Sequence, residues 1–292
     1  MIANPQAAKG YRQGGLRAVE DVFRHARVPY EISVTQGPGH ATELARLAVK
    51  EGWRRIVAIG GDGTMGETLN GIVGSDAALG VIPAGTGNDM AFTLGMAKDM
   101  GVAARQLLMA RTQRIDVGRD PDGHFGIILG LGFSTDVMQY CNTHSSLFQG
   151  SAAILAAIIT ILNRLRPVSM RVTMDNGSFE GAYMAVFVMN TRRTGGGLRM
   201  APTASLTDGM FDLVLVGAMS KPDFLMTLPK AYQGRHLGNP AVSLHRTRKV
   251  CIETSEPLRK MFDGNVLGQT PVNAEVVPLG LSVLVPDGWD LE

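Results

Sequence analysis

Apolar positions in the first 110 residues follow two alternating spacings. Short apolar runs predict strands, and stretches with apolar residues three and four positions apart predict helices. The predicted strands cover residues 30–34, 55–59 and 79–82, and the predicted helices cover 41–51, 64–73, a segment around Met90 and 101–110. Strand, glycine-containing turn and helix therefore repeat, which is typical of a parallel sheet with crossover helices. Ligands of such sheets bind at the carboxyl ends of the strands.

The pattern changes near residue 117, beyond which strand-like runs predominate. These runs cover residues 125–131, 168–174, 183–189, 211–216, 250–253 and 281–285. Asp175-Asn176-Gly177 is a hairpin signal between two of them, and helices are predicted only at 147–165 and 222–232. We therefore expect the α/β fold class in two domains. A parallel-sheet domain covers residues 1–117, a mainly antiparallel domain covers residues 118–285, and a return of residues 286–292 to the first domain is left open.

One uncharged stretch approaches the length of a membrane span. Residues 145–163 contain no charged side chain, and about 20 apolar residues are needed to cross a bilayer. Polar residues and glycine dilute the stretch, and its flanks are strand-like. We expect a buried or surface-lying helix here, and this is our first candidate for contact with a membrane surface.

Composition narrows the classes of function. The chain has 292 residues, a formal net charge of +2 and a charged fraction of 18%, and its basic residues are scattered, so a nucleic-acid groove is not indicated. Cys141 and Cys251 stand far apart, which excludes a disulfide framework and a zinc-type cysteine spacing. We expect a cytoplasmic protein. Glycine accounts for 36 residues, so the backbone turns tightly or approaches ligands closely in many places.

The strongest chemical signal is Gly60-Gly61-Asp62-Gly63-Thr64, between a predicted strand and a predicted helix. Glycines let the backbone approach a phosphate, and a helix N-terminus supplies positive potential. A carboxylate beside a phosphate is tolerated when a divalent cation lies between them. The alternative is an ordinary glycine turn in which Asp62 caps the helix.

A second motif makes the phosphate interpretation stronger. Pro83-Ala84-Gly85-Thr86-Gly87-Asn88-Asp89 follows the next strand and also precedes a helix. Two such turns at neighbouring strand ends make a cleft for nucleotide phosphate and metal. Neither motif is a P-loop or the dinucleotide fingerprint.

Together these motifs resemble the diacylglycerol kinase catalytic domain that bacterial lipid kinases share with sphingosine kinases. The resemblance covers almost the whole chain in the expected order. Its further matches are Asn4-Pro5, Thr35, Gly39-His40-Ala41, Glu67, Asn70-Gly71, the run 114–118, Asn190, the glycines 195–197, Pro202, the run 208–212 and the run 261–264.

The resemblance implies an α/β nucleotide-binding domain, a β-sandwich-like lipid-substrate domain and an active site between them. It further implies that ATP phosphorylates a lipid hydroxyl with the help of Mg²⁺. The residues implied to bind the nucleotide are Asn4, Thr35, Gly60, Gly61, Asp62, Gly63, Thr64, Gly85, Thr86 and Asn88. Those implied to place the metal are Asp62, Asp89 and Asp116, and Asp208 with the carbonyl of Met210 resembles a second, structural metal site.

The same resemblance makes Asp263 the catalytic proton acceptor for the lipid hydroxyl. Read without the resemblance, Asp263-Gly264 is a favoured hairpin turn. The family usually has Asp-Gly-Glu at this point, and here Asn265 replaces the glutamate. Asn265 keeps an amide oxygen but lacks the charge, which puts full activity in question.

Three functions therefore stand side by side. An ATP-dependent lipid kinase leads; the others are a non-catalytic nucleotide- or lipid-binding relative and a NAD kinase-like enzyme, which shares the GGDG loop. The expected partners are a nucleotide and a lipid substrate at the membrane surface, with peripheral membrane contact but no nucleic acid. Homodimer formation is left open, and the sequence does not identify the lipid.

Overall fold

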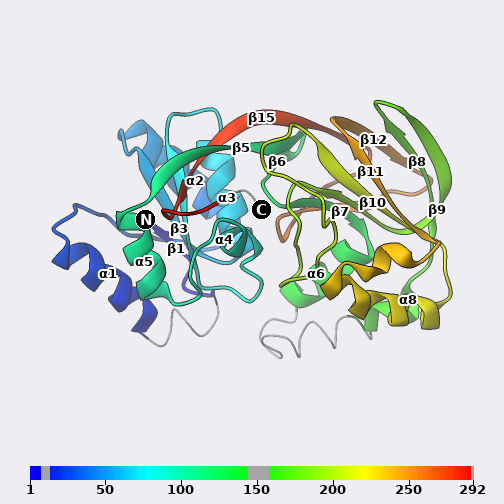
Figure 1. Ribbon diagram of the computed structural model, residues 1–292, viewed down its shortest axis with the longest axis horizontal. Helices are drawn as coiled ribbons and strands as arrows, with labels where there is room; N and C mark the ends of the chain where they lie inside the picture. The colour runs from blue at the N-terminus through cyan, green and yellow to red at the C-terminus, as the bar shows by residue number, and fades with distance from the viewer. Residues whose placement is uncertain (8–13, 144–157, 159, 291–292) are drawn as a thin grey trace. The chain divides into compact units, whose positions relative to one another are not determined.

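The computed structural model describes residues 1–7, 14–143, 158 and 160–290. The chain divides into two compact units, the first made of Met1–Asp116 with Pro278–Glu292 and the second of Val117–Val277. Two long strands, β5 (Arg111–Asp120) and β15 (Val272–Val285), run from one unit into the other (Figure 1). The chain thus returns to unit 1 before residue 286. Because β15 is one continuous strand, its apolar pattern does not reveal the change from unit 2 to unit 1 between Val277 and Pro278.

Unit 1 is a parallel sheet with helices, as the alternating pattern predicts. Its strand order is β15-β4-β3-β1-β2, and the pairs β1–β2, β1–β3, β3–β4 and β4–β15 are all parallel. The strands are β1 (Ile2–Ala3), β2 (Ser33–Val34), β3 (Arg55–Gly60) and β4 (Ala78–Pro83). The helices are α1 (Leu16–His25), α2 (His40–Lys50), α3 (Asp62–Ile72), α4 (Asp89–Thr93) and α5 (Met100–Leu108).

The sheet of unit 1 is covered on both faces. Every residue of β4 and all but the first residue of β3 are buried, which explains why these strands are uniformly apolar rather than alternating. Helices α2 and α3 pack closely because a Cβ on Gly71 would meet the Cβ of Ala45 at 2.5 Å. The glycine is therefore a packing requirement of the helix pair.

Unit 2 is built from antiparallel strands. Its strand path is β14-β13-β7-β9-β8-β12-β15, and β10 pairs with both β9 and β11. The strands are β6 (Gly123–Phe125), β7 (Ile128–Gly132), β8 (Val168–Met174), β9 (Gly177–Met189), β10 (Phe211–Gly217), β11 (Val242–Thr247), β12 (Lys249–Thr254), β13 (Arg259–Phe262) and β14 (Asn265–Gln269). The predicted fold class, parallel in the first half and mainly antiparallel in the second, is confirmed.

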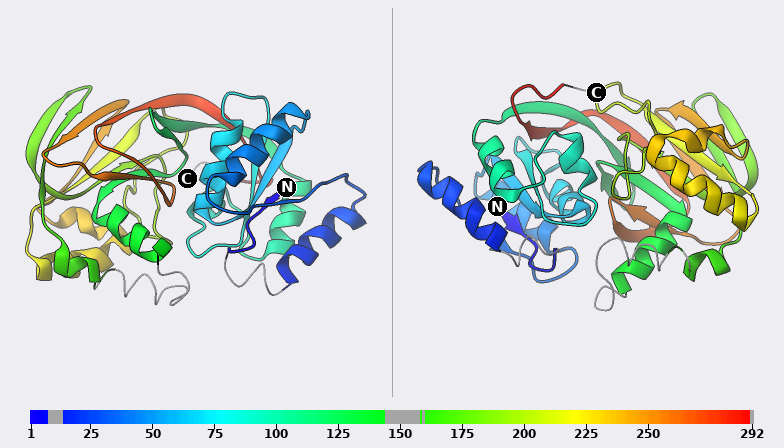
Figure 2. Two further views of the ribbon diagram at one scale, coloured as in Figure 1. Left: turned by 180° about the vertical axis from the view of Figure 1, so that it is seen from behind. Right: turned by 60° about the horizontal axis from the view of Figure 1, so that its bottom comes forward.

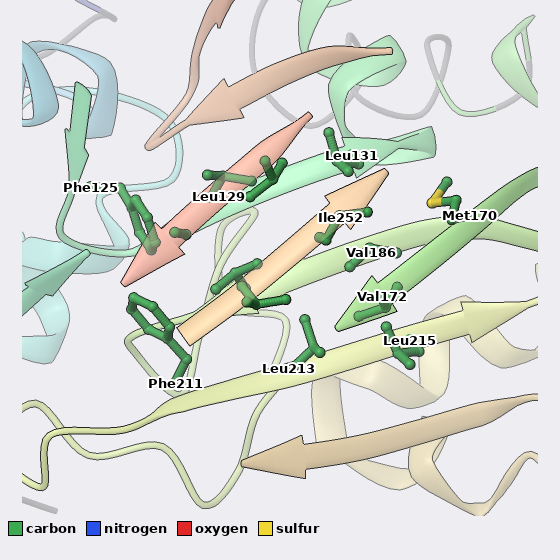
Figure 3. Packing of buried hydrophobic residues seen from close by; sticks show 14 of the residues in the cluster. Phe125, Leu129, Leu131, Met170, Val172, Val186, Phe211, Leu213, Leu215 and Ile252 are labelled. Atoms are coloured by element: carbon green, nitrogen blue, oxygen red, sulfur yellow. The ribbon is translucent and has the colours of Figure 1, made fainter. Parts of the chain in front are cut away.

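The core of unit 2 is formed by inward-facing residues of several strands (Figure 3). Phe125 stacks on Phe211 with ring centroids 5.4 Å apart, and Phe125 meets Phe262 edge to face at 6.2 Å. Leu129, Val186, Leu213 and Ile252 continue this core along the sheet. Phe262 directly precedes Asp263, so the core anchors the strand that leads to the predicted proton acceptor.

The helices of unit 2 are α6 (Phe133–Thr143), α8 (Lys221–Thr227) and the 3₁₀ segments η2 (Leu228–Gln233) and η3 (Arg235–Gly238). The helix predicted at 222–232 is thus present as α8 followed by η2. The stretch 145–163 lies largely outside the described residues. Among the helices that the structure does describe, none has the length and apolar character needed to cross a bilayer.

Candidate functional site

The predicted nucleotide residues of unit 1 gather at one edge of its sheet. Asn4 follows β1, Thr35 follows β2, Gly60 ends β3 and Gly85 is the second residue after β4. The backbone fixes this edge: the N–H of Asn4 donates to the Ile59 carbonyl at 3.0 Å, and the N–H of Thr35 donates to the Ala3 carbonyl at 2.9 Å. The carboxyl ends of four neighbouring parallel strands therefore carry the residues that the sequence singles out.

The two glycine-rich loops touch each other through backbone atoms. A Cβ on Gly85 would lie 2.4 Å from the Cα of Gly61, and a Cβ on Gly60 would lie 2.6 Å from the Thr64 side chain. The Ala84 N–H also donates to the Gly60 carbonyl at 2.9 Å. Any larger residue would force the loops apart, so their backbones form a single continuous lining. Such a lining is what phosphate binding by backbone N–H groups requires.

Helix α3 begins inside this lining. Its first backbone hydrogen bond runs from the Met65 N–H to the Gly61 carbonyl at 3.0 Å, so the positive end of its macrodipole lies at the glycines. Asn4 supports this end, because its amide nitrogen donates to the hydroxyl of the buried Thr64 at 3.1 Å. Thr64 is thus held in place by Asn4 rather than pointing into solvent.

The second loop is stiffened by Asn88. Asn88 has a positive φ of 57°, which asparagine tolerates better than most residues. Its side chain both accepts from the Gly85 N–H and donates to the Gly85 carbonyl, each at 2.8 Å. Asn88 therefore shapes the loop, while Thr86 is exposed at its tip.

The three carboxylates implied to place the metal have different surroundings. Asp62 is half-buried, and its Oδ1 accepts the Met90 N–H at 3.2 Å. Asp116 is fully buried, and its Oδ1 accepts the Leu279 N–H at 2.7 Å, which ties β5 to β15. Asp89 is buried at the start of α4. Across the described residues, no three carboxylate, histidine or cysteine side chains are grouped to hold a metal directly.

A metal that arrives with a nucleotide does not need such a group. Mg²⁺ in phosphate-transferring sites is commonly held by one or two carboxylates, phosphate oxygens and water. Asp62, next to a backbone lining suited to phosphates, fits this chemistry. The wider network with Asp89 and Asp116 remains a prediction.

Glu67 is a positioning residue to which the sequence pattern assigned no role. It projects from α3, and its carboxylate accepts the N–H groups of Gly39 at 2.8 Å and Ala41 at 3.2 Å. A carboxylate at a helix N-terminus stabilises it through hydrogen bonds and charge. Glu67 therefore fixes the start of α2 and the loop that carries Thr35. In the sequence, the position of Glu67 one helical turn after Gly63 was the signal that could have indicated this role.

In unit 2, Asp263 lies in the turn between β13 and β14. Asp263 and Gly264 both have positive φ, 49° and 97°, and Phe262 pairs with Asn265 across the turn. Positive φ at both central residues is what a two-residue hairpin with a type I′ turn requires. The hairpin interpretation of these residues is therefore confirmed, and it does not exclude a catalytic role.

The carboxylate of Asp263 accepts three backbone hydrogen bonds. Gly126 donates to Oδ2 at 2.6 Å, and Ile127 and Ile128 donate to Oδ1 at 2.8 and 2.9 Å. A carboxylate offers about four acceptor positions, so about one remains after these three bonds. With an exposed fraction of 1%, Asp263 is both a structural anchor and a candidate base with little spare capacity.

Burial sets the protonation behaviour of this group. Loss of water raises the pKa of Asp263 to about 6, and the three N–H donors act in the opposite direction by favouring the charged form. A pKa near 6 suits a residue that must accept a proton near neutral pH and release it afterwards.

The second metal site implied at Asp208 and Met210 has a different occupant here. The Asp208 carboxylate pairs with the guanidinium of Arg246 and also accepts the Met210 N–H at 3.0 Å. Arg246 further approaches the buried Asp212 at 3.9 Å. A guanidinium and a metal ion compete for the same oxygen, so these residues do not fit a metal while Arg246 is in place.

Unit 2 also contains a buried ion cluster that sequence reasoning missed. Lys260, three residues before Asp263, has an exposed fraction of 2%. Its ammonium lies 2.6 Å from Asp120 and 2.5 Å from Asp122, and Asp120 also accepts the Asn273 N–H at 2.9 Å. The segment 120–128 is thus held at one end by Lys260 and at the other by Asp263. A lysine directly before the Met261-Phe262 pair that leads to Asp263 was the signal that could have revealed it.

Comparisons with known proteins match the same two halves. Residues 1–119 match the model of the diacylglycerol kinase catalytic domain, and residues 128–285 match the YegS C-terminal NAD kinase beta sandwich-like domain. The chain is 30% identical over 274 residues to a diacylglycerol kinase of Bacillus subtilis, covering 93% of this chain and 90% of that protein. It is 31% identical over 293 residues to a diacylglycerol kinase of Mycobacterium tuberculosis, covering 98% and 94%.

Solved structures show the same fold. A crystal structure of a diacylglycerol kinase from Bacillus anthracis superposes with a TM-score of 0.75 at 23% identity, covering 98% of this chain and 96% of that one.

Proposed function

Because the chain belongs to the diacylglycerol kinase catalytic domain family, we propose that it transfers the γ-phosphoryl group of ATP to a lipid hydroxyl with Mg²⁺. Membership makes it a phosphotransferase with an alcohol acceptor. The nucleotide, the metal and a diacylglycerol-like acceptor are the proposed part. The observation that carries the proposal is the direct backbone contact between the two glycine-rich loops at Gly61 and Gly85.

In this proposal, unit 1 binds and orients the nucleotide. The backbone of Gly60, Gly61 and Gly85 and the positive end of α3 hold phosphate oxygens, and Asn4 and Thr35 place the rest of the nucleotide at the same sheet edge. When bound, Mg²⁺ would neutralise the phosphate charge, and Asp62 would hold the ion directly or through water. Phosphoryl transfer consists mainly of positioning and charge stabilisation, so few reacting side chains are needed.

Unit 2 supplies the proton acceptor. A carboxylate is too weak a base to ionise an alcohol before phosphoryl transfer begins, because the pKa of an alcohol lies far above that of a carboxylic acid. Asp263 therefore accepts the hydroxyl proton late in the transfer. Three of its acceptor positions are filled by Gly126, Ile127 and Ile128, and the proton goes to the remaining position. Asp263 also anchors the hairpin, which ties the proposed base to the fold of unit 2.

A single assay separates the proposed function from its rivals. The protein is incubated with radiolabelled ATP, Mg²⁺ and either a diacylglycerol, a polyprenol, a long-chain base or NAD. Label on a lipid supports the proposal, whereas label only on NAD supports the NAD kinase-like enzyme. Nucleotide binding without transfer to any acceptor supports the non-catalytic relative, for which Asn265 is the motivating residue.

The pH dependence of the reaction tests Asp263. With a pKa of about 6, the base is mostly ionised at pH 7, so we expect kcat/KM at pH 5 to be roughly tenfold lower. Stability moves the other way. Because folding raises the pKa of this carboxyl, its protonation stabilises the folded state at low pH. This stabilisation is lost as the pH rises from about 4 to 6. A kcat/KM that stays flat down to pH 5 while Tm rises would remove Asp263 from the chemistry and leave it a structural role.

Restoring the family's carboxylate tests the role of position 265. Asn265→Glu adds a charge to the segment that follows Asp263, and we expect the Mg²⁺ concentration for half-maximal rate to fall. A half-buried, partly screened charge contributes under about 1 kcal/mol, which corresponds to a fivefold change or less. Asn265→Gln, which keeps the amide, is the matched control. An unchanged or higher Mg²⁺ requirement in Asn265→Glu would show that position 265 is not part of the metal network.

A further inference from the structure

The α8–η2 segment, Lys221–Gln233, is apolar on two faces. Its inner face is buried and holds Phe224, Thr227 and Ala231. Phe224 meets Phe133 of α6 edge to face, with ring centroids 4.7 Å apart, so α8 contacts the start of α6; Figure 2 shows the helices of unit 2 from two further sides. A helix packed on a protein usually presents polar residues on its other side. Here the other side is apolar as well.

The outer face carries Pro222, Leu225, Met226, Pro229 and Tyr232, all exposed. Spacings of three and four residues place them on one stripe, and in a 3₁₀ segment such as η2 residues three apart are directly aligned. The exposed fractions of Leu225, Met226 and Tyr232 are 42%, 62% and 56%. Single exposed apolar residues are ordinary, but a continuous stripe of them indicates a contact surface.

Positive charge accompanies this stripe. Lys221, Lys230 and Arg235 are exposed along α8, η2 and η3. Asp223 is the one carboxylate of Lys221–Gly238, and it is half-buried, with its Oδ1 accepting from the Asn239 amide at 3.1 Å. An outer surface of apolar side chains flanked by cations matches the boundary between the acyl chains and the headgroups of an anionic bilayer.

We infer that the outer face of α8–η2, formed by Pro222, Leu225, Met226, Pro229 and Tyr232 with Lys221, Lys230 and Arg235, binds anionic lipid bilayers. This inference rests on the proposed function only in that a lipid substrate brings the enzyme to a membrane. Binding itself requires neither nucleotide nor turnover. The sequence pattern assigned membrane contact to other residues, the stretch 145–163.

Co-sedimentation with vesicles tests the inference without an activity assay. Wild-type protein is mixed with phosphatidylcholine vesicles that contain 30 mol% phosphatidylglycerol or none, with nucleotide absent. We expect binding to the anionic vesicles that weakens with salt. Replacing Leu225, Met226 and Tyr232 together by Ser should lower the partition coefficient at least tenfold, and Lys230→Gln should lower it on the order of fivefold.

Controls make each outcome decisive. Leu47 and Met109 are also exposed apolar residues, at 51% and 72%, but lie in unit 1, and their replacement by Ser should leave binding unchanged. The inference is overturned if the triple variant, with unchanged Tm, binds vesicles as the wild type does, or if the wild type does not bind them. It is also overturned if the triple variant converts a dimer to a monomer without a change in vesicle binding, because the stripe then joins two copies. Turnover of a detergent-dispersed lipid by the triple variant reports on the proposed function separately.

Discussion

Asp62→Asn is expected to lower the rate of phosphoryl transfer about a thousandfold while leaving the fold intact. The variant keeps the shape of the side chain, and its amide oxygen can still accept the Met90 N–H that Asp62 accepts at 3.2 Å. What it loses is the charge. Attraction between unit charges at about 4 Å is worth about 4 kcal/mol at an effective dielectric constant near 20, and about 1.4 kcal/mol corresponds to a factor of ten in rate.

The measurement is single-turnover transfer from radiolabelled ATP at saturating Mg²⁺, with circular dichroism and Tm as checks on folding. Asp76→Asn is the matched control, because Asp76 is an exposed carboxylate of the same unit that pairs with Arg54 at 3.0 Å. We expect the control to keep its full rate. An Asp62→Asn protein with the wild-type rate would show that the glycine-rich loops do not place the metal through this residue.

The layout of unit 1 could be predicted because its signals are local. Four strands of its sheet, β1 to β4, end in turns that the sequence marks with Asn4, Thr35, the glycine-rich run 60–63 or the glycine-rich run 85–87. Parallel pairing then brings these turns to one edge without further information. Even the contact between Gly61 and Gly85 follows from two glycine turns on adjacent strands.

Elements with mixed patterns were harder to predict. Strand β11 has the sequence VSLHRT with only two fully buried positions, so its apolar signal is weak. Helices α1 and α6 carry polar residues among their apolar ones, and no strong start signal precedes them: Gly15 caps α1 without a side-chain hydrogen bond. In β11 and α6 the weak pattern leaves the conformation to contacts with neighbouring elements, which sequence periodicity does not show. Helix α1 is different, because its apolar residues Val19 and Phe23 lie on one buried face, and this spacing was a signal that was available in the sequence.

Long-range contacts explain what was missed at the site. The N–H donors of Asp263 lie more than 130 residues away along the chain, in the segment 126–128. Nothing around Asp263-Gly264 indicates that the carboxylate will be buried or held by three bonds. The same applies to Arg246 on Asp208 and to Lys260 on Asp120, both of which join segments far apart in sequence.

Lys260→Met is expected to destabilise unit 2 by about 3–5 kcal/mol. Met fits the volume of the lysine stem, but the variant leaves the Asp120 carboxylate, fully buried, without its cation. Breaking one partner out of a buried ion pair costs about this much because the other charge stays buried and uncompensated. For a domain of this size the loss corresponds to a fall in Tm on the order of 10 °C.

Two further variants separate the buried charge from the loss of a lysine as such. Lys249→Met removes an exposed lysine of the same unit that lies 3.3 Å from Glu275, and an exposed pair contributes under about 1 kcal/mol, so its Tm should barely change. Lys260→Met combined with Asp120→Asn removes both charges and should recover part of the stability, because a neutral amide is less costly to bury than a carboxylate. The measurement is urea unfolding of all three proteins at pH 7. If the double variant were less stable than Lys260→Met by the full cost of a second lesion, the lysine and the aspartate would be acting independently. The hairpin that carries Asp263 would then owe its position to the Phe262 core rather than to the ion cluster.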